Sequence, residues 1–246
     1  MEQRGAREAG GDGRQVRGHV LSDEIHSELT LGGRRHNPFA GISPEFERGS
    51  ITCVSPSKTF NLSGLSAAVV VIPDPDLRRR YVEVTDGTMG DINVFRLRAM
   101  EVAYREGDEW LEQVLDYIRG NVEFVLRFLE DRVPAIPPVP PEGTYLVWLD
   151  CRGLGMDPGA MDRFFLEAGV GLMSGSDFGP GGEGFMRINV ACPRRLLEEA
   201  LGRMERAVAE VISPEDAGLL WASQKWKGIG CPAMRRVWKI NIAWGP

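Results

Sequence analysis

Lysine is scarce in this sequence, and its scarcity singles out one residue. Three of the four lysines lie after residue 224, so residues 1–224 hold Lys58 alone against twenty-three arginines. A coding bias toward arginine would explain this ratio without any function. A guanidinium stays charged, however, and cannot replace an amine that has to act as a nucleophile. Lys58 is therefore the first candidate for a chemical role.

Other absences narrow the class of protein. The four cysteines are widely separated and form no Cys-x-x-Cys pair, which favours reduced thiols over a zinc site. The net charge of −6 argues against a nucleic-acid-binding face, because such a face has to be basic. No stretch approaches the roughly 20 apolar residues of a membrane span, and residues 1–18 lack the apolar core of a signal peptide. We therefore expect a cytoplasmic protein that binds neither nucleic acid nor membrane.

The first part of the chain has the pattern of an α/β domain. Short apolar runs at 19–22, 51–54 and 67–72 are bounded by turn residues. Buried helix segments can give the same pattern, but the valine and isoleucine content favours buried strands of a mostly parallel sheet. Apolar residues then recur at steps of three and four from 111 to 129, which predicts one long amphipathic helix or two helices in line.

The later part predicts a smaller α+β domain. Four prolines between 137 and 141 form a stiff connection that cannot continue a helix. The spacing beyond them predicts strands and helices in alternation, at 145–149, 159–168, 185–190 and 196–211.

These patterns divide the chain into four segments. They are a disordered lead-in (1–18), a first domain (19–105), a smaller domain (106–211) and an atypical tail (212–246). The tail holds four of the six tryptophans. It is either a packed C-terminal extension or a run-on segment without selected structure.

Polar clusters follow the first two predicted strands. Asp23 and His26 come after the first strand, and Ser55, Ser57 and Lys58 come after the second. Ligands of open α/β sheets bind at the carboxyl ends of strands, so we expect both clusters to face one crevice. The groups suit a pyridine aldehyde that carries a phosphate: a carboxylate for the ring nitrogen, an imidazole for a ring oxygen, hydroxyls for the phosphate and an amine for the imine. Helix capping and turn formation are the structural alternatives.

The sequence resembles fold-type I pyridoxal-phosphate (PLP) enzymes, in particular the MalY/PatB branch of the class I/II aminotransferase family, which includes cystathionine β-lyases. Five separated stretches appear in the family's order between about residue 19 and about residue 211. They are SDEIHSELTLGGRRHNPFA (22–40), SPSKTFNLSGL (55–65), AMEVAYREGDEWLEQVLDYIRGN (99–121), EGTYLVWLD (142–150) and FGPGGEGFMRINVACPR (178–194). The first two favour the lyase branch, because ordinary aminotransferases more often carry tyrosine at the position of His26.

The resemblance implies an α/β fold with a partial PLP-binding large domain and a smaller C-terminal α+β domain. It implies that Lys58 forms the imine with PLP and that Asp23 pairs with the pyridine nitrogen. His26 is then expected near the ring oxygen, and Ser55 and Ser57 near the phosphate.

The resemblance also implies a substrate site and a reaction. Arg187 matches the arginine that binds the α-carboxylate of the amino-acid substrate, with a structural salt bridge as the alternative. The implied activity is that of a C–S β-lyase, in which the Lys58 amine removes the Cα proton and a thiolate leaves from Cβ. The products are pyruvate, ammonia and a thiol, which is homocysteine when the substrate is cystathionine.

The family's sequence before its first matched strand has no counterpart in residues 1–18. In the family that portion supplies a phosphate-binding helix start, a ring that stacks on the pyridine, and an asparagine near the ring oxygen. Each such contact is worth about 1–3 kcal/mol, so we expect weak cofactor binding by this chain alone, together with an exposed sheet edge.

Three functions remain open at this point. The chain is a C–S lyase, a PLP-dependent aminotransferase, or a catalytically silent chain that acts only by binding protein. For an enzyme, the family's homodimer or a complementing chain is the expected partner.

Overall fold

The computed structural model describes residues 18–212. The described chain forms two compact units, with the division between Val114 and Leu115, inside one long helix. This division falls a few residues after the border expected between 105 and 106. Nearly all of the expected lead-in (1–18) and tail (212–246) lies outside the described residues.

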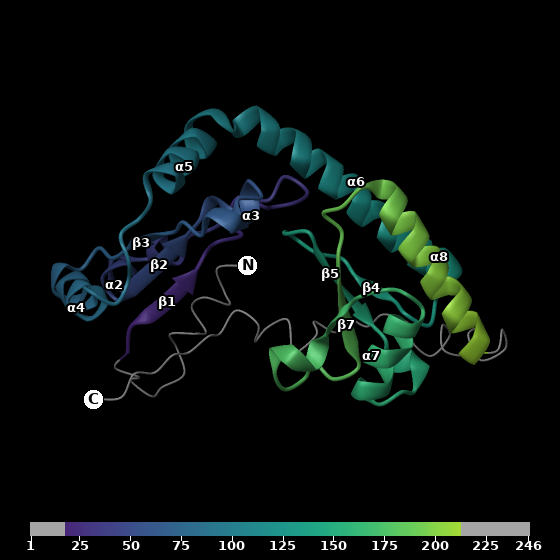
Figure 1. Cartoon of the computed structure of the whole chain (residues 1–246). Helices are drawn as coiled ribbons and strands as arrows, with labels where there is room; N and C mark the ends of the chain where they lie inside the picture. Colours follow the sequence, from purple (N-terminus) through teal and green to yellow (C-terminus); the bar gives the residue numbers. More distant parts are fainter. Residues whose placement is uncertain (1–17, 213–246) are drawn as a thin grey trace. The chain divides into compact units, whose positions relative to one another are not determined.

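The first unit contains a three-stranded sheet in the order β1-β2-β3 (Figure 1). The strands are β1 (Val20–Asp23), β2 (Ser50–Val54) and β3 (Val69–Val71). They confirm the three strands that the apolar runs predicted. The first two are parallel, whereas β3 runs antiparallel to β2.

Burial of these strands is less complete than the sequence predicted. The inner strand β2 is buried or half-buried along its length. In β1, Val20 is 40% exposed and Leu21 38%, and in β3 Val71 is 47% exposed. The prediction that all three strands are buried was therefore wrong for β1 and β3. Within the described residues each of these strands pairs with β2 alone, so both are edge strands.

Helices of the first unit connect and follow the strands. One helix that the sequence analysis missed, α4, begins with Asp74 as its N-cap and a proline in its first turn, which is a recognisable start signal. The amphipathic segment at 111–129 lies in one helix, so the first of its two alternatives is confirmed. Gly107 separates this helix from the one before it, and a Cβ at this position would collide with the Ala103 carbonyl oxygen and the Phe60 ring. The helices are α2 (Pro44–Arg48), α3 (Pro56–Thr59), α4 (Pro75–Thr85), α5 (Val94–Glu106) and α6 (Asp108–Arg132), with 3-10 turns at Phe39–Gly41 and Ser63–Leu65.

The second unit has an antiparallel sheet in the order β4-β5-β7-β6. Its inner strands, β5 (Leu146–Asp150) and β7 (Phe185–Asn189), confirm the two predicted strands. The outer strands, β4 (Pro138–Val139) and β6 (Met173–Ser174), have two residues each and were not predicted. Proline is tolerated in β4 because an edge strand leaves one side of its backbone unpaired.

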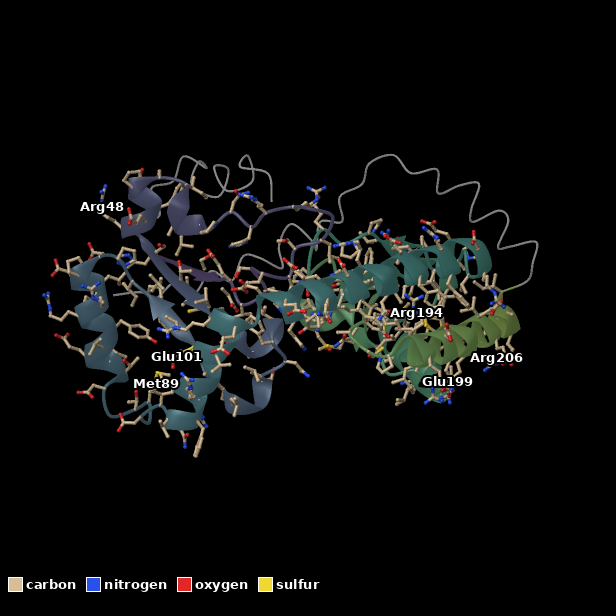
Figure 2. All side chains as sticks on the ribbon, turned by 90° about the horizontal axis from the view of Figure 1, so that it is seen from above. Arg48, Met89, Glu101, Arg194, Glu199 and Arg206 are labelled. Atoms are coloured by element: carbon tan, nitrogen blue, oxygen red, sulfur yellow. The ribbon has the colours of Figure 1, made fainter. Side chains whose placement is uncertain are left out.

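Helices of the second unit are the rest of α6, α7 (Pro158–Glu167) and α8 (Arg194–Val211). The last two confirm the helices predicted at 159–168 and 196–211. In α8, Arg194 (labelled in Figure 2) donates from Nε to the Asn121 side chain of α6 at 2.9 Å, and its guanidinium lies 4.4 Å from the centre of the Phe124 ring. Short 3-10 turns occur at Arg152–Leu154 and Gly175–Phe178.

Candidate functional site

The two predicted polar clusters lie at the same end of the first unit's sheet. Strand β1 ends at Asp23, which is in register with Cys53 in the penultimate position of β2. Adjacent strands lie about 4.8 Å apart, and parallel strands have their carboxyl ends at one edge. The residues after Val54 therefore begin beside the residues after Asp23 (Figure 1). The structure thus brings together five of the six predicted site residues.

Lys58 lies in α3, a helix of only four residues that begins directly after β2. Ser55 is the N-cap, and its Oγ accepts a hydrogen bond from the Ser57 backbone N–H at 3.1 Å. The Ser55 hydroxyl also donates to the Ala67 carbonyl oxygen at 2.6 Å and is 2.9 Å from the Ser57 hydroxyl. Lys58 is half-exposed, and within residues 18–212 its amine makes no hydrogen bond or ion pair.

Asp23 and His26 lie in the turn that follows β1. The exposed Asp23 carboxylate accepts a long hydrogen bond of 3.3 Å from the Ile25 backbone N–H. Its negative charge acts on Cys53 in β2: the pKa of that thiol is raised first by burial and second by Asp23. His26 is half-buried, and its carbonyl oxygen accepts from the Leu29 N–H at 3.0 Å. Asp23 therefore keeps most of its hydrogen-bonding capacity for another group.

Glu24, which the sequence analysis did not single out, fixes the turn next to Asp23. Its side chain is only 6% exposed, and a buried carboxylate requires hydrogen-bond or charge partners. One oxygen accepts from the Ser22 hydroxyl and from the Phe39 backbone N–H, both at 2.9 Å, and the other lies 2.7 Å from His36 Nε2. Glu24 therefore joins the end of β1 to the loop that returns at residue 39. These partners are up to fifteen positions away, so the sequence pattern carried no signal for them.

A separate apolar groove lies close to α3 in sequence, but no predicted site residue lines it. The groove has a volume of about 520 Å³ and is open to solvent. Its walls include Phe60, Leu62, Phe95 and Trp110. Arg98 is the one charged residue in its lining, and a guanidinium cannot act as the proton acceptor that the chemistry at Lys58 requires.

Arg187 lies in the second unit, on β7, between its register partners Trp148 and Met173. Its guanidinium is 4.3 Å from the centre of the Phe178 ring, and burial lowers its pKa from the ordinary value. The Nε atom is buried without a hydrogen-bond partner, and no carboxylate within residues 18–212 pairs with this arginine. A structural salt bridge, the alternative for Arg187, is therefore absent from the described part of the chain.

Comparison with known protein families identifies the family of the chain. Residues 14–204 match the model of the aminotransferase class I and II family. The chain belongs to this family. As a member of it, the chain is 39% identical over 192 residues to the cystathionine β-lyase PatB of Bacillus subtilis, a match that covers 77% of this chain and 50% of PatB.

Solved structures of family members have the same fold. A PLP-bound putative aminotransferase from Clostridium difficile superposes with a TM-score of 0.81 at 37% identity, covering 85% of this chain and 54% of that one. Cystalysin from Treponema denticola, whose structure contains pyridoxal 5'-phosphate, has a TM-score of 0.77 at 36% identity and covers 79% and 50%. The chain spans about half the length of the curated relatives it matches. An α/β fold of PLP fold type I is thereby confirmed for the matched part.

Two kinds of site are not found among the described residues. Residues 18–212 contain no group of three or more histidine, cysteine, aspartate or glutamate side chains placed to hold a metal ion. Within the same range, no helix is both long and apolar enough to span a membrane.

Proposed function

We propose that this chain acts in PLP-dependent C–S β-lyase chemistry, which cleaves an L-cysteine thioether to pyruvate, ammonia and a thiol. The observation that carries the proposal is the Lys58 amine, which has no partner within residues 18–212, in a helix that follows the strand paired with β1, whose last residue is Asp23. PatB, at 39% identity, is a cystathionine β-lyase. The His26 position supports the same branch of the family.

The donor groups of the site fit the cofactor. Among the described residues, the fit rests on an amine without a partner, a carboxylate with one weak hydrogen bond, and two hydroxyls at the start of α3. Ser55 is the more committed of the hydroxyls, because it already donates to Ala67. We therefore assign Ser57 to direct contact with the phosphate, and Ser55 to holding Ser57 beside it.

The described side chains divide the tasks of the proposed reaction. When bound, PLP would supply an electron sink for the charge that develops at Cα. Asp23 would hold the ring nitrogen and His26 the ring oxygen. Lys58 would hold the cofactor and, as general base, take the Cα proton. A thiolate would then leave from Cβ and take up a proton to become the thiol, and water would convert the remaining three-carbon fragment to pyruvate and ammonia.

Arg187 is proposed to bind the α-carboxylate of the substrate. A guanidinium is the planar fork of donors that grips a carboxylate through two parallel hydrogen bonds, and one terminal nitrogen of Arg187 is fixed by donating to Met173 Sδ at 2.7 Å. The Phe178 ring beneath the guanidinium favours a planar cation and restricts its orientation.

A partner is part of the proposal, and the chain spans about half the length of the curated relatives it matches. We propose that a second copy of the chain, or a complementing chain, supplies the remaining cofactor contacts in the cytoplasm. The expected result for the chain alone is weak cofactor binding.

The decisive test is an absorbance titration of the purified chain with PLP, followed by borohydride reduction and peptide mapping. The expected result is one reduced adduct on Lys58, which Lys58→Arg abolishes because a guanidinium does not form the imine. The lysines at 225, 227 and 239 are internal controls for non-specific reaction. An adduct spread evenly over all four lysines would contradict the assignment.

An aminotransferase is the second candidate, because the Clostridium difficile protein is described as a putative aminotransferase. The two activities differ in their need for an acceptor. A lyase releases pyruvate from cystathionine without any added keto acid, whereas an aminotransferase requires one. If cofactor binds at Lys58 and neither reaction occurs, the third alternative, a silent chain that binds protein, is favoured.

A further inference from the structure

The helix that carries Lys58 is too short to be stable without contacts from neighbouring residues. A single helical turn fixes several backbone dihedrals for each hydrogen bond that it gains, so it is unstable in isolation. Helix α3 has only four residues. The direction of the Lys58 side chain therefore depends on the contacts of its neighbours in the chain.

Thr59, the residue after Lys58, provides one of these contacts. Its side chain is 1% exposed, and its hydroxyl donates to Glu28 Oε2 at 2.9 Å. Glu28 lies in the turn after β1, two residues beyond His26. The bond thus joins the turn that follows Asp23 to the helix that carries Lys58, across thirty-one positions of sequence.

An aromatic contact joins the end of α3 to α5 beside this bond. Phe60 follows Thr59, and its ring meets the Tyr104 ring edge-on at a centroid distance of 5.7 Å. Burial, and second the negative charge of Glu28, raise the pKa of Tyr104 to about 12. Tyr104 is therefore uncharged at neutral pH and close enough to Glu28 to sense its charge. A charge-assisted hydrogen bond in such partly buried surroundings is stronger than one in water.

We propose that Glu28 is a positioning residue: through Thr59 it sets the direction of the Lys58 amine relative to the turn that carries Asp23 and His26. This inference rests on the proposed function of Lys58. Glu28 does not touch the reacting atoms in this account. It acts on Lys58 only through the backbone that Thr59 anchors.

The test compares four variants of the full chain. Glu28→Ala and Thr59→Val remove the bond, whereas Glu28→Gln keeps an oxygen that accepts from Thr59. Thr85→Val is the matched control, because within the described residues the Thr85 hydroxyl bonds only to carbonyl oxygens of its own helix, at Tyr81 and Val82. Two readouts are used: the association constant for PLP at Lys58, with the adduct mapped after reduction, and amide hydrogen exchange in residues 55–60 without cofactor.

The expected results separate positioning from general stability. Glu28→Ala and Thr59→Val lower the association constant at Lys58 and speed exchange in residues 55–60, each by about tenfold, as expected for loss of one charge-assisted hydrogen bond. Glu28→Gln restores most of both, and Thr85→Val changes neither. Melting curves identify any variant that unfolds globally. If Glu28→Ala or Thr59→Val does so, wild type is compared instead with Glu28→Gln and with Thr59→Ser, which retains the hydroxyl.

The proposal is overturned if folded Glu28→Ala and Thr59→Val exchange residues 55–60 at the wild-type rate, or if they bind PLP at Lys58 as tightly as wild type. Failure of the proposed function gives a different result, because wild type itself then forms no specific adduct on Lys58. The exchange experiment still decides in that case whether Glu28 positions α3.

Discussion

The two units of the described chain differ in how fully their apolar residues are buried. Residues 115–212 contain twenty-one buried hydrophobic residues and five large hydrophobics that remain exposed, whereas residues 18–114 contain five and thirteen. Valine and leucine occur in both units, so composition alone does not explain the difference. In the second unit both central strands have a neighbour on each side, and three helices accompany the sheet. In the first unit two of the three strands are edges.

Regular secondary structure therefore forms in the first unit without a fully buried apolar core. The three strands of the first unit form at the expected places, yet Met89 (labelled in Figure 2), between α4 and α5, is 66% exposed, and Phe95 in α5 is 75% exposed. Five of the six candidate site residues lie in this less complete unit. Its local geometry therefore depends more on individual polar contacts, such as those of Glu24 and Glu28, than on a large apolar core.

The largest expected effect is in the core of the second unit. Phe165 is fully buried in α7, so Phe165→Ala removes a ring from a packed core and leaves a cavity. We expect a loss of about 3–5 kcal/mol in the free energy of unfolding. Val71→Ala, at a 47% exposed position of the first unit, is the matched control and is expected to cost less than about 1 kcal/mol. Denaturant unfolding measures both, and equal costs would contradict the difference between the units.

The next effect tests whether polar contacts replace a core in the first unit. Glu24→Ala leaves the Phe39 N–H, the Ser22 hydroxyl and His36 without their common acceptor. We expect a loss of about 2–3 kcal/mol in the free energy of unfolding. Glu24→Gln, which keeps an acceptor oxygen for Phe39, is expected to lose less than half of that. If Glu24→Ala costs no more than an exposed substitution such as Glu101→Ala, the loop is held by other contacts.

The sequence predicted the elements of the fold better than their surroundings. Runs of β-branched residues predicted β2 and β3 because such residues favour strands wherever those strands lie. The same runs led to the prediction that β1 and β3 are buried, since an apolar pattern does not show whether a strand has a neighbour on each side. The Asp74-Pro75 start of α4 was present in the sequence and was overlooked.

In the candidate site, too, the positions of the strand ends could be predicted and the side-chain contacts around them could not. The clusters after β1 and β2 could be predicted to meet, because parallel strands bring their carboxyl ends to one edge. The roles of Asp23, Lys58 and Arg187 remain predictions. The contacts of Glu24 and Glu28 could not be predicted, since each depends on a partner between twelve and thirty-one positions away.

The reactivity of one cysteine in each unit allows the two units to be compared without substituting a core residue. Cys151 is buried in the second unit and Cys53 is half-buried in the first. Burial raises the pKa of both thiols above the ordinary value of 9.0, so their thiolate fractions at pH 8 are small and rise as the pH is increased. With Cys192 and Cys231 replaced by serine, we expect a thiol reagent to label Cys53 at least about tenfold faster than Cys151, because Cys151 requires an opening of its core.

Asp23→Asn sharpens this comparison. The negative charge of Asp23 is the second cause of the raised pKa of Cys53, so its removal lowers that pKa and increases the thiolate fraction at pH 8. Labelling of Cys53 should become a few-fold faster while that of Cys151 stays the same. Equal acceleration at both cysteines would indicate a general loosening of the protein instead of a local change in charge.

The smallest expected effect on stability is at the exposed face of β3. Val71→Thr replaces one β-branched residue by another, so we expect the free energy of unfolding to change by no more than about 0.5 kcal/mol. Self-association should nevertheless decrease, because exposed apolar side chains on an edge strand favour pairing between chains. Sedimentation velocity at several protein concentrations measures it, with Val84→Thr on α4, 75% exposed but outside the sheet, as the control. An equal decrease in both variants would show that general surface hydrophobicity, and not the open edge of the sheet, drives the association.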